Sequence, residues 1–394
     1  MKISLGRRDQ ASPKVARRAP PVEDAPRVRR QRIPDPDGPR LVIGVMTGTS
    51  LDGLDACLLR IEGKGLALKA TLLDQVIAPL GAIGDELRRL ADQQLMTARE
   101  IATLARDFSL LHATALQPLV DEHEVDLIAV HGQTVFHAPP VSWQLFNPAL
   151  LAHAVGVPVV CDLRAADLAA GGQGAPITPL ADHLLFRQVD EARTVVNLGG
   201  FCNLTILPSG LTLDGIAGRD VCACNQLLDA AARLCLGRPY DDDGETAMAG
   251  EVLDLLFTSL TTLLDKQQRA GRSLGTGDEL AGWLAKLGDR RPPPPDLLRT
   301  VVAAVAHTIC RQLGDTRRVI LAGGGCRNQA LMLELKHRAG RPVTTTAKYG
   351  IPIDLREAAA MALLGTLCQD RIPITLPNVT RVTTAPVAGV WAYP

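Results

Sequence analysis

Two segments of this chain share one pattern, and that pattern limits the folds available to it. Residues 41–61 and residues 194–208 each show an apolar run rich in β-branched side chains, then a turn of glycine and small residues, then a second apolar run. Runs of this kind predict two strands joined by a tight turn. Because each half of the chain opens in this way, the sequence predicts an α/β protein with two similar domains that face one cleft.

The size and composition of the chain agree with this interpretation. It has 394 residues, of which 46% are hydrophobic and 21% are charged, as expected of a globular protein long enough for two domains and not of a disordered or collagen-like one. Lys and Arg total 42, as do Asp and Glu, so no global field draws the protein to nucleic acid or to an anionic membrane. No apolar run approaches the ~20 residues of a membrane-spanning helix. We therefore expect neither nucleic acid nor a membrane as a partner.

The cysteines and the first residues predict a cytoplasmic protein. Nine cysteines, an odd number, are spread along the chain without the density of a small disulfide-rich scaffold. Residues 1–10 offer no apolar stretch after their charges, which argues against a secretory signal. A zinc or redox site at Cys222 and Cys224 would need a second matching pair, which the sequence lacks. Reduced thiols in the cytoplasm are the expectation.

Residues 1–40 differ in composition from the rest of the chain. They hold eleven Lys or Arg residues, five Asp or Glu residues and seven prolines, with few large apolar side chains. Such a segment cannot bury enough surface to offset the entropy of ordering it. We expect a disordered, solvated extension there, and a functional basic arm is the alternative that the composition leaves open.

Polar residues follow a short apolar run at 127–130. The segment 131–134 (His-Gly-Gln-Thr) comes directly after that run, and ligands collect at the carboxyl ends of strands in α/β sheets. His131 and His137 are six residues apart, a spacing that matches no helical metal site. The sequence thus predicts a ligand site at this strand end, without a metal.

Two glycine-containing loops can each be interpreted in two ways. Residues 47–50 (Thr-Gly-Thr-Ser) offer hydroxyls and backbone N–H groups to a phosphate, and Asp52 could hold a hydrated magnesium ion. A Walker loop is excluded because no Gly-Lys-Ser/Thr follows. An ordinary hairpin explains this turn equally well. The glycines in 171–174 either let the backbone approach a ligand or form a surface loop.

Further along the chain, Asp220 precedes a helical pattern, where its carboxylate can face the cleft or cap the helix. The Gly323–Gly325 turn lies between a predicted strand and a helix, so a nucleotide could lie against bare backbone. The prolines at 292–295 precede a helix for which Asp296 is the expected cap, and the small residues at 358–365 predict a tightly packed helix. The residues alone thus indicate a nucleotide-binding, two-domain α/β protein.

The chain resembles the anhydro-N-acetylmuramic acid kinase family in seven segments, over about residues 41–394. The segments are GVMTGTSLDGLD, HGQTVFH, NPALLA, GGQGAP, NLGGFCNLT, AGGGCRN and the YGIP that precedes Glu357. The resemblance implies two ribonuclease-H-like domains around an ATP cleft, the actin/hexokinase-like fold. It also implies a kinase that uses ATP and Mg²⁺ to open 1,6-anhydro-N-acetylmuramic acid with water and to phosphorylate its O6. The product would be N-acetylmuramic acid 6-phosphate, formed in peptidoglycan recycling.

The same resemblance implies domain limits and site residues. Residues 1–40 would be the extension, 41–190 the first domain and 191–394 the second, with the helix near 357–369 able to return to the first. Asp220 stands where the family has its general base, which takes a proton from the attacking water. The sugar would contact Thr134, Gln144, Asn147, Arg164 and Glu357. The nucleotide and its phosphates would contact Gly48, Thr49, Ser50, Leu51, Asp52, Gly53, Leu54, Asp55, Gly199, Gly200, Gly323, Gly324 and Gly325.

Several positions depart from the family pattern. Where the family can carry an arginine run, residues 164–166 are Arg-Ala-Ala, and Cys222, Cys224 and Asp182 stand where it has two glycines and a histidine. Arginine pairs bidentately with carboxylates, and the muramic lactyl group carries one. We therefore expect weak recognition of that acid. The alternatives are a kinase of another anhydro sugar and a pseudokinase that binds sugar or nucleotide without turnover. The expected partners are the sugar and ATP, and a homodimer is left open.

Overall fold

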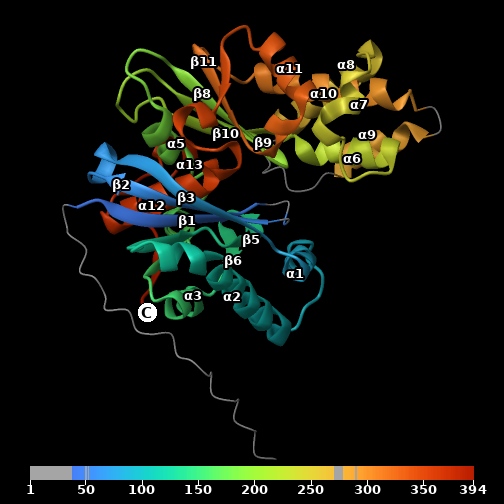
Figure 1. The fold of residues 1–394 in the computed structure, drawn as a ribbon. Helices are drawn as coiled ribbons and strands as arrows, with labels where there is room; N and C mark the ends of the chain where they lie inside the picture. The colour runs from blue at the N-terminus through green and yellow to red at the C-terminus, as the bar shows by residue number, and fades with distance from the viewer. Residues whose placement is uncertain (1–37, 49–50, 52, 270–277, 289–290) are drawn as a thin grey trace, which may run out of the picture.

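The computed structural model describes residues 38–48, 51, 53–269, 278–288 and 291–394. Residues 1–37 of the extension predicted for residues 1–40 therefore lie outside the described residues. Figure 1 shows two sheets, each flanked by helices, with further helices between them. No helix in the described part of the chain combines the length and the apolar character that crossing a bilayer requires.

The first sheet has six strands in the order β13-β7-β4-β1-β2-β3. Strands β1, β2 and β3 are antiparallel neighbours, β4 and β7 run parallel to β1, and β13 pairs antiparallel with β7. The predicted hairpin and the predicted strand at 127–130 are confirmed. The strands are β1 (Arg40–Thr47), β2 (Gly53–Glu62), β3 (Lys69–Pro79), β4 (Leu127–Val130), β7 (Val159–Cys161) and β13 (Val390–Ala392).

The second sheet repeats this topology in the order β10-β9-β8-β11-β12. Strands β8, β9 and β10 are antiparallel neighbours, and β11 and β12 run parallel to β8. The same ribonuclease-H-like order thus occurs twice, which confirms the predicted α/β, actin/hexokinase-like fold class. The strands are β8 (Arg193–Leu198), β9 (Phe201–Leu207), β10 (Ala217–Ala223), β11 (Arg318–Ala322) and β12 (Val343–Thr345).

Helices cover the outer face of each sheet and fill the space between the sheets (Figure 1). On the first sheet, the outer helices are α1 (Ala82–Ala91), α2 (Ala98–Glu122) and α3 (Pro148–Val155), with the separate hairpin β5 (Gln133–Ala138) and β6 (Val141–Leu145) nearby. On the second, they are α6 (Asn225–Leu236), α7 (Glu245–Met248), α8 (Asp254–Arg269), α9 (Asp278–Lys286), α10 (Pro294–Cys310) and α11 (Gln329–Arg338). The short 3-10 helices are η1 (Gly65–Ala67), η2 (Asp242–Gly244), η4 (Gly324–Arg327), η5 (Thr346–Tyr349) and η6 (Ile353–Leu355).

One hydrophobic core joins the two sheets. Val42 of β1 and Val195 of β8 are fully buried in the same cluster as most of α12 (Arg356–Gln369) and α5 (Pro179–Phe186). Ile43, the next residue of β1, belongs instead to the cluster beneath α1, α2 and α3, as the alternation of side chains along a strand requires. Val379 of α13 (Pro377–Thr380) belongs to the same cluster, and Ala166 of α4 (Ala165–Ala169) packs against it.

Helix α12 contacts the first sheet backbone to backbone, which confirms the tight packing predicted for residues 358–365. A Cβ atom on Gly44 would lie 2.0 Å from the Ala358 carbonyl oxygen and 2.5 Å from the Ala362 nitrogen. A Cβ atom on Gly365 would lie 2.4 Å from the Ala129 Cβ. Glycine at these two positions therefore sets how closely α12 approaches β1 and β4. The division of the chain into domains at residue 190 stays a prediction.

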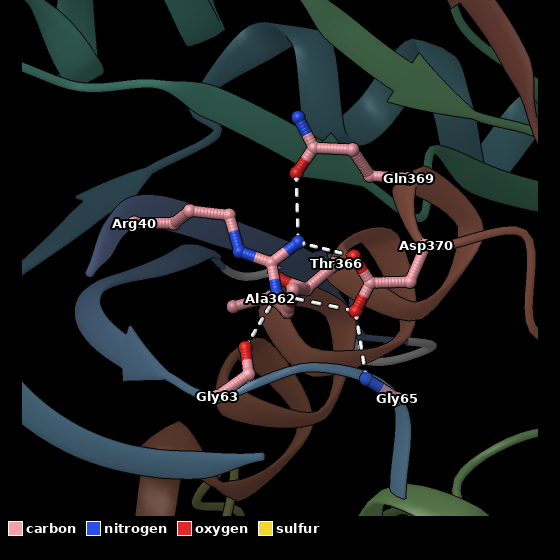
Figure 2. A network of polar contacts seen from close by, with 7 residues as sticks. All are labelled: Arg40, Gly63, Gly65, Ala362, Thr366, Gln369 and Asp370. Atoms are coloured by element: carbon pink, nitrogen blue, oxygen red, sulfur yellow. Dashed lines mark hydrogen bonds and ion pairs between the residues drawn. The ribbon is translucent and has the colours of Figure 1, made fainter. Parts of the chain in front are cut away.

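A polar network fixes the far end of the same helix (Figure 2). The Arg40 guanidinium donates to Gln369 Oε1 at 3.1 Å, to Asp370 Oδ1 at 2.6 Å and to the Gly63 carbonyl at 3.0 Å. The Gly65 amide donates to the other carboxylate oxygen of Asp370 at 2.9 Å. The start of β1, the turn after β2 and the end of α12 are thereby held together, at the end of β1 opposite Gly48.

The expected cap of α10 is wrong. The helix begins at Pro294 with Pro293 as its N-cap, so Asp296 lies inside the first turn. Asp296 Oδ1 accepts from the Glu251 amide at 2.9 Å. A proline tolerates the first helical position because it needs no donor there, and the carboxylate is thereby available to order the segment before α8.

The Gly44→Ala variant tests the contact between β1 and α12. We expect a loss of about 1–3 kcal/mol in the free energy of unfolding, because the new methyl group must displace the backbone of α12. The matched control is Gly282→Ala in α9, where a Cβ atom meets nothing within 4 Å and where alanine stabilises a helix by up to about 1 kcal/mol. Urea denaturation measures both, and equal midpoints for Gly44→Ala and the wild type would contradict the packing described.

Candidate active site

The parallel strands of the first sheet end at one edge, and the predicted ligand-binding segments follow them there. Thr47 ends β1, Val130 ends β4 and Cys161 ends β7, and these three strands are parallel neighbours. Gly48, His131 and Arg164 therefore belong to the loops at the carboxyl edge of the sheet. This is the edge at which α/β sheets bind ligands.

Arg164 lies at the centre of these loops. Its Nε and Nη2 atoms both donate to His131 Nε2, at 3.0 and 2.9 Å, and its Nη1 donates to the Gly174 carbonyl at 2.7 Å. Burial lowers the pKa of Arg164 to about 10, and the carboxylates of Glu357 and Asp220 act to raise it. The guanidinium is therefore cationic at neutral pH and lies close enough to both acids for their charges to act on it.

Asp220 belongs to the second sheet. It pairs with Asn203 in the ladder between β10 and β9, immediately before a β-bulge, a feature that commonly re-aims side chains beside functional sites. The residue is exposed, yet the surrounding protein removes enough water to raise the pKa of its carboxyl group, an effect that Arg164 opposes. The capping alternative is wrong, because α6 begins at Asn225 with Cys224 as its N-cap and has no side-chain cap.

Glu357 lies in the first turn of α12. Burial raises the pKa of this carboxyl group; Arg356 and Arg164 act to lower it and Asp182 to raise it. Arg164, from the first sheet, therefore acts electrostatically on two acids, Asp220 in β10 and Glu357 in α12. The structure brings these three predicted residues together.

A buried ion pair positions the start of α12. Arg356 Nε donates to Asp182 Oδ1 at 2.8 Å, Arg356 Nη2 also pairs with Asp182, and Thr205 Oγ1 donates to Asp182 Oδ2 at 2.6 Å. Both charged side chains are almost completely buried. The pair joins α12 to α5, and Thr205 joins α5 to β9. Because Glu357 directly follows Arg356, this pair also determines where Glu357 lies.

The other residues expected to contact the sugar lie on the β5–β6 hairpin and just after it. Gln144 Nε2 donates to Thr134 Oγ1 at 3.2 Å across the hairpin. Asn147 caps α3 by accepting from the Leu150 amide at 3.4 Å, which confirms the predicted helix start. Burial, and then the charge of Arg164, lower the pKa of His137 in β5, so the hairpin lies within the electrostatic reach of Arg164.

The glycine turns of the second sheet meet at the ends of β8 and β11, which are parallel neighbours. The Gly199 carbonyl accepts from the Asn225 amide at 3.1 Å, and the Gly200 carbonyl accepts from the amide of Cys224, the N-cap of α6, at 2.9 Å. Gly323 has φ +87°, and a Cβ atom there would lie 2.8 Å from the Leu198 carbonyl oxygen. A side chain is thus excluded at Gly323, and at the neighbouring Gly325 a Cβ atom would lie 2.8 Å from the Leu198 Cβ. The adjacent Gly324 is less crowded, since a Cβ atom there meets only side-chain atoms, at 3.6 Å and beyond.

The expected phosphate loop is described in part. Thr49, Ser50 and Asp52 lie outside the described residues. The Leu51 amide donates to the Gly48 carbonyl at 3.2 Å, which makes a turn. The last three expected residues, Gly53, Leu54 and Asp55, begin β2. The side chains of Leu51 and Leu54 are buried in the core, so these two leucines can offer a ligand only backbone groups.

The glycine-rich loop at 171–174 packs closely against a buried acid. A Cβ atom on Gly172 would lie 2.2 Å from a carboxylate oxygen of Asp167. The same carboxylate accepts from the Gly174 amide at 2.7 Å and from Thr380 Oγ1 at 2.8 Å. The loop thereby wraps a buried acid, and this arrangement carries the Gly174 carbonyl to Arg164.

The thiols next to Asp220 do not form a chemical site. Cys222 and Cys224 are fully buried, and burial raises the pKa of Cys222 to about 12 and that of Cys224 well above its usual value. Protonated buried thiols are poor nucleophiles and poor metal ligands. Among the described residues, one cluster has ligand atoms close enough together to hold a metal ion. It consists of Asp74 on β3 with Glu122 and His123 at the end of α2.

Sequence reasoning missed three partners of the predicted residues. The sequence places His131 in a predicted ligand-binding segment but does not predict its contact with Arg164, and it predicts no role in the site for Arg356 or Asp182. Arg356 could have been found from the sequence, because it directly precedes Glu357. Nothing in the sequence pairs Arg356 with Asp182, which lies 174 residues away.

Comparison with known proteins identifies relatives over almost the whole described chain. The model of the anhydro-N-acetylmuramic acid kinase family matches residues 40–394. An anhydro-N-acetylmuramic acid kinase of Bordetella pertussis is 39% identical over 90% of this chain and 96% of that protein, and one of Salinibacter ruber is 33% identical over the same shares. Among solved structures, component A of the (R)-2-hydroxyglutaryl-CoA dehydratase of Acidaminococcus fermentans is similar over 82% of this chain and 96% of that chain, with 14% identity and a TM-score of 0.43.

The Asp182→Asn variant tests the buried ion pair. We expect a loss of about 3–5 kcal/mol in the free energy of unfolding, because Arg356 would be left as an uncompensated buried charge. The double variant Asp182→Leu with Arg356→Met removes both charges and should recover most of that loss. Chemical denaturation at neutral pH measures all three proteins. A loss below about 1 kcal/mol in Asp182→Asn would mean that Arg356 finds another partner.

Proposed function

This chain belongs to the anhydro-N-acetylmuramic acid kinase family, and on that premise we propose that it hydrolyses and phosphorylates 1,6-anhydro-N-acetylmuramic acid with ATP. The product is N-acetylmuramic acid 6-phosphate, an intermediate of peptidoglycan recycling. The observation that carries the proposal is that Arg164, in a loop of the first sheet, lies within electrostatic reach of both Asp220 in β10 and Glu357 in α12. Nine unpaired cysteines support a cytoplasmic location, where thiols stay reduced.

Asp220 is the general base of the proposed reaction. Its carboxylate accepts a proton from the water that attacks the anomeric carbon, while the bond between that carbon and O6 breaks. O6 forms a bond to the γ-phosphorus of ATP, and the bond from that phosphorus to the bridging oxygen breaks, so that ADP leaves. A positioned base contributes about 10²–10⁴-fold to such a step. Loss of water raises the pKa of the carboxyl group, and the charge of Arg164 opposes that rise, so Arg164 favours the ionised form that a base needs.

Arg164 and the β5–β6 hairpin bind the sugar in this proposal. A guanidinium has five N–H donors. Arg164 uses three of them, two in its bonds to His131 and one in its bond to Gly174. The other two suit a carboxylate such as the lactyl group of the substrate. Thr134, Gln144 and Asn147 offer hydroxyl and amide groups for the hydroxyls and the N-acetyl group of the ring.

The residues at the end of β1 fit the phosphates of ATP. Thr47 Oγ1 is buried without a hydrogen-bond partner among the described residues, directly before Gly48, and a hydroxyl there can donate to an oxyanion. The glycine turns at 199–200 and 323–325 form the nucleotide side. Mg²⁺ usually takes one or two carboxylates together with phosphate oxygens, so Asp52 is the proposed ligand. When bound, the ion neutralises the charge that develops on the transferred phosphoryl group.

The Asp220→Asn variant tests the general base. We expect turnover to fall by about two to four orders of magnitude while ATP affinity stays unchanged, because asparagine keeps the shape but accepts no proton. Asp214→Asn is the matched control, since Asp214 is an exposed aspartate in the preceding loop. Steady-state kinetics and calorimetric titration with ATP measure the two quantities. Near-normal turnover in Asp220→Asn would remove Asp220 from the role.

ADP release from ATP, measured with 1,6-anhydro-N-acetylmuramic acid, levoglucosan and plain hexosamines, tests the function itself. We expect the muramic sugar to be the substrate, with a high KM. Ala165 and Ala166 supply no guanidinium, and each charge-assisted contact is worth about 1.5–3 kcal/mol, or roughly ten- to a hundredfold in affinity. Saturation at micromolar sugar would show that arginines at these positions are not needed for the lactyl group. Sugar binding without ADP release from any sugar would identify a pseudokinase.

A further inference from the structure

The proposed function leaves one buried titratable residue of the site without a task. His131 follows β4 and is 4% exposed. Its Nδ1 atom lies 2.8 Å from the carbonyl oxygen of Gly132, and its Nε2 atom accepts from both Nε and Nη2 of Arg164. Every polar atom of the imidazole is therefore bonded, and one side of the ring is occupied by the cation of the site.

The backbone at Gly132 determines which ring nitrogen carries the hydrogen. Gly132 has φ +74°, and a Cβ atom there would lie 3.2 Å from the Leu145 carbonyl oxygen, so a side chain is both strained and crowded at this position. In this conformation the Gly132 carbonyl lies against Nδ1 of the preceding residue. A carbonyl can only accept, so Nδ1 must donate and Nε2 must present its lone pair to Arg164.

We propose that His131 is a positioning residue, a neutral acceptor that holds the Arg164 guanidinium where its charge faces Asp220 and Glu357. This inference rests on the proposed function of the site. The side edge of the guanidinium, formed by Nε and Nη2, is fixed by the imidazole, and Nη1 is fixed by Gly174. With both contacts made, the guanidinium cannot turn away from the two acids, and its remaining donors keep one direction for the substrate.

A neutral partner is what this position requires. A carboxylate in place of His131 would pair with Arg164 and cancel the charge that acts on Asp220 and Glu357. Burial, reinforced by the charge of Arg164 itself, lowers the pKa of His131 to about 3, so the ring is uncharged at neutral pH. The imidazole thus fixes the direction of the guanidinium and leaves its charge intact.

Moving Arg164 would change the pKa of the titratable groups around it. Asp220 faces it from β10, Glu357 from α12 and His137 from β5. Around the acids, Arg356 and Asp182 act on Glu357, and Cys202 of β9 lies near Asp220 but has a strongly raised pKa and stays protonated. If Arg164 turned away, the carboxyl group of Asp220 would lose the charge that lowers its pKa. The fall of kcat/KM at acidic pH would then begin at a higher pH.

His131→Leu, His131→Gln and Arg164→Met test the proposal in the full-length enzyme. Leucine fills the space without an acceptor, whereas glutamine keeps an oxygen within reach of the guanidinium. We expect His131→Leu to lose about ten- to a hundredfold in kcat/KM, the worth of a charge-assisted contact, with its fall at acidic pH beginning at a higher pH. His131→Gln should recover part of the rate and the original pH profile. Because His131 acts through Arg164, adding His131→Leu to Arg164→Met should cost almost nothing further.

Two results would overturn the proposal. If His131→Leu lowers kcat/KM by the same factor with and without Arg164→Met, His131 acts independently of Arg164. If His131→Gln is as impaired as His131→Leu with the wild-type pH profile, the imidazole only fills space. Calorimetric ATP binding and thermal unfolding identify a variant that has simply failed to fold.

A readout without turnover separates this proposal from the proposed function. In ¹⁵N-labelled protein, the Arg164 Nε–H resonance, assigned by its absence in Arg164→Met, should exchange slowly with water in the wild type and in His131→Gln, and rapidly in His131→Leu. Slow exchange in the wild type without ADP release from any sugar would sustain the role of His131 and reject the proposed function. Equal exchange in the wild type and His131→Leu would reject the role of His131 even in an active kinase.

Discussion

The buried pair of Arg356 and Asp182 is the constraint on which the centre of the molecule depends. A charge moved from water into a protein costs several kcal/mol unless a partner and hydrogen bonds compensate for it. Arg356 and Asp182 are both buried, so each requires the other in place. One begins α12 and the other lies in α5, the two helices packed between the sheets. The pair thereby fixes the central layer, and with it the position of Glu357.

The electrostatics of the site depends on this arrangement of the sheets. Asp220 and Glu357 have both lost water, and this loss raises the pKa of both carboxyl groups. Arg164 favours the ionised form of both, although it belongs to neither of their elements. Because the first sheet supplies the cation and the second supplies Asp220, the ionisation of the acid depends on how the sheets are held. This is a physical reason for an enzyme of this fold to order its central layer so tightly.

Several departures from the family pattern turn out to be matters of packing. Cys222 and Cys224 are fully buried apolar members of the core of the second sheet, and neither thiol is ionised at neutral pH. Asp182 is the partner of Arg356. Ala165 is exposed and Ala166 is half-buried against the shared core, so an arginine is accommodated far more easily at position 165. Of these departures, the alanines are the ones that bear on sugar choice.

Local sequence patterns predict the repeated strand-turn-strand units, the strand at 127–130, the helix start at Asn147 and an α/β architecture. These follow from local chemistry, since apolar alternation, glycine turns and helix caps act over a few residues. The folded structure was needed to show that Asp220 lies in a strand, that the 171–174 loop wraps Asp167, and that His131 contacts Arg164. Each of these depends on residues far apart in the chain, and a pairing of two buried polar groups leaves no periodic signal. The local pattern limits which elements form, whereas burial of charge selects their partners.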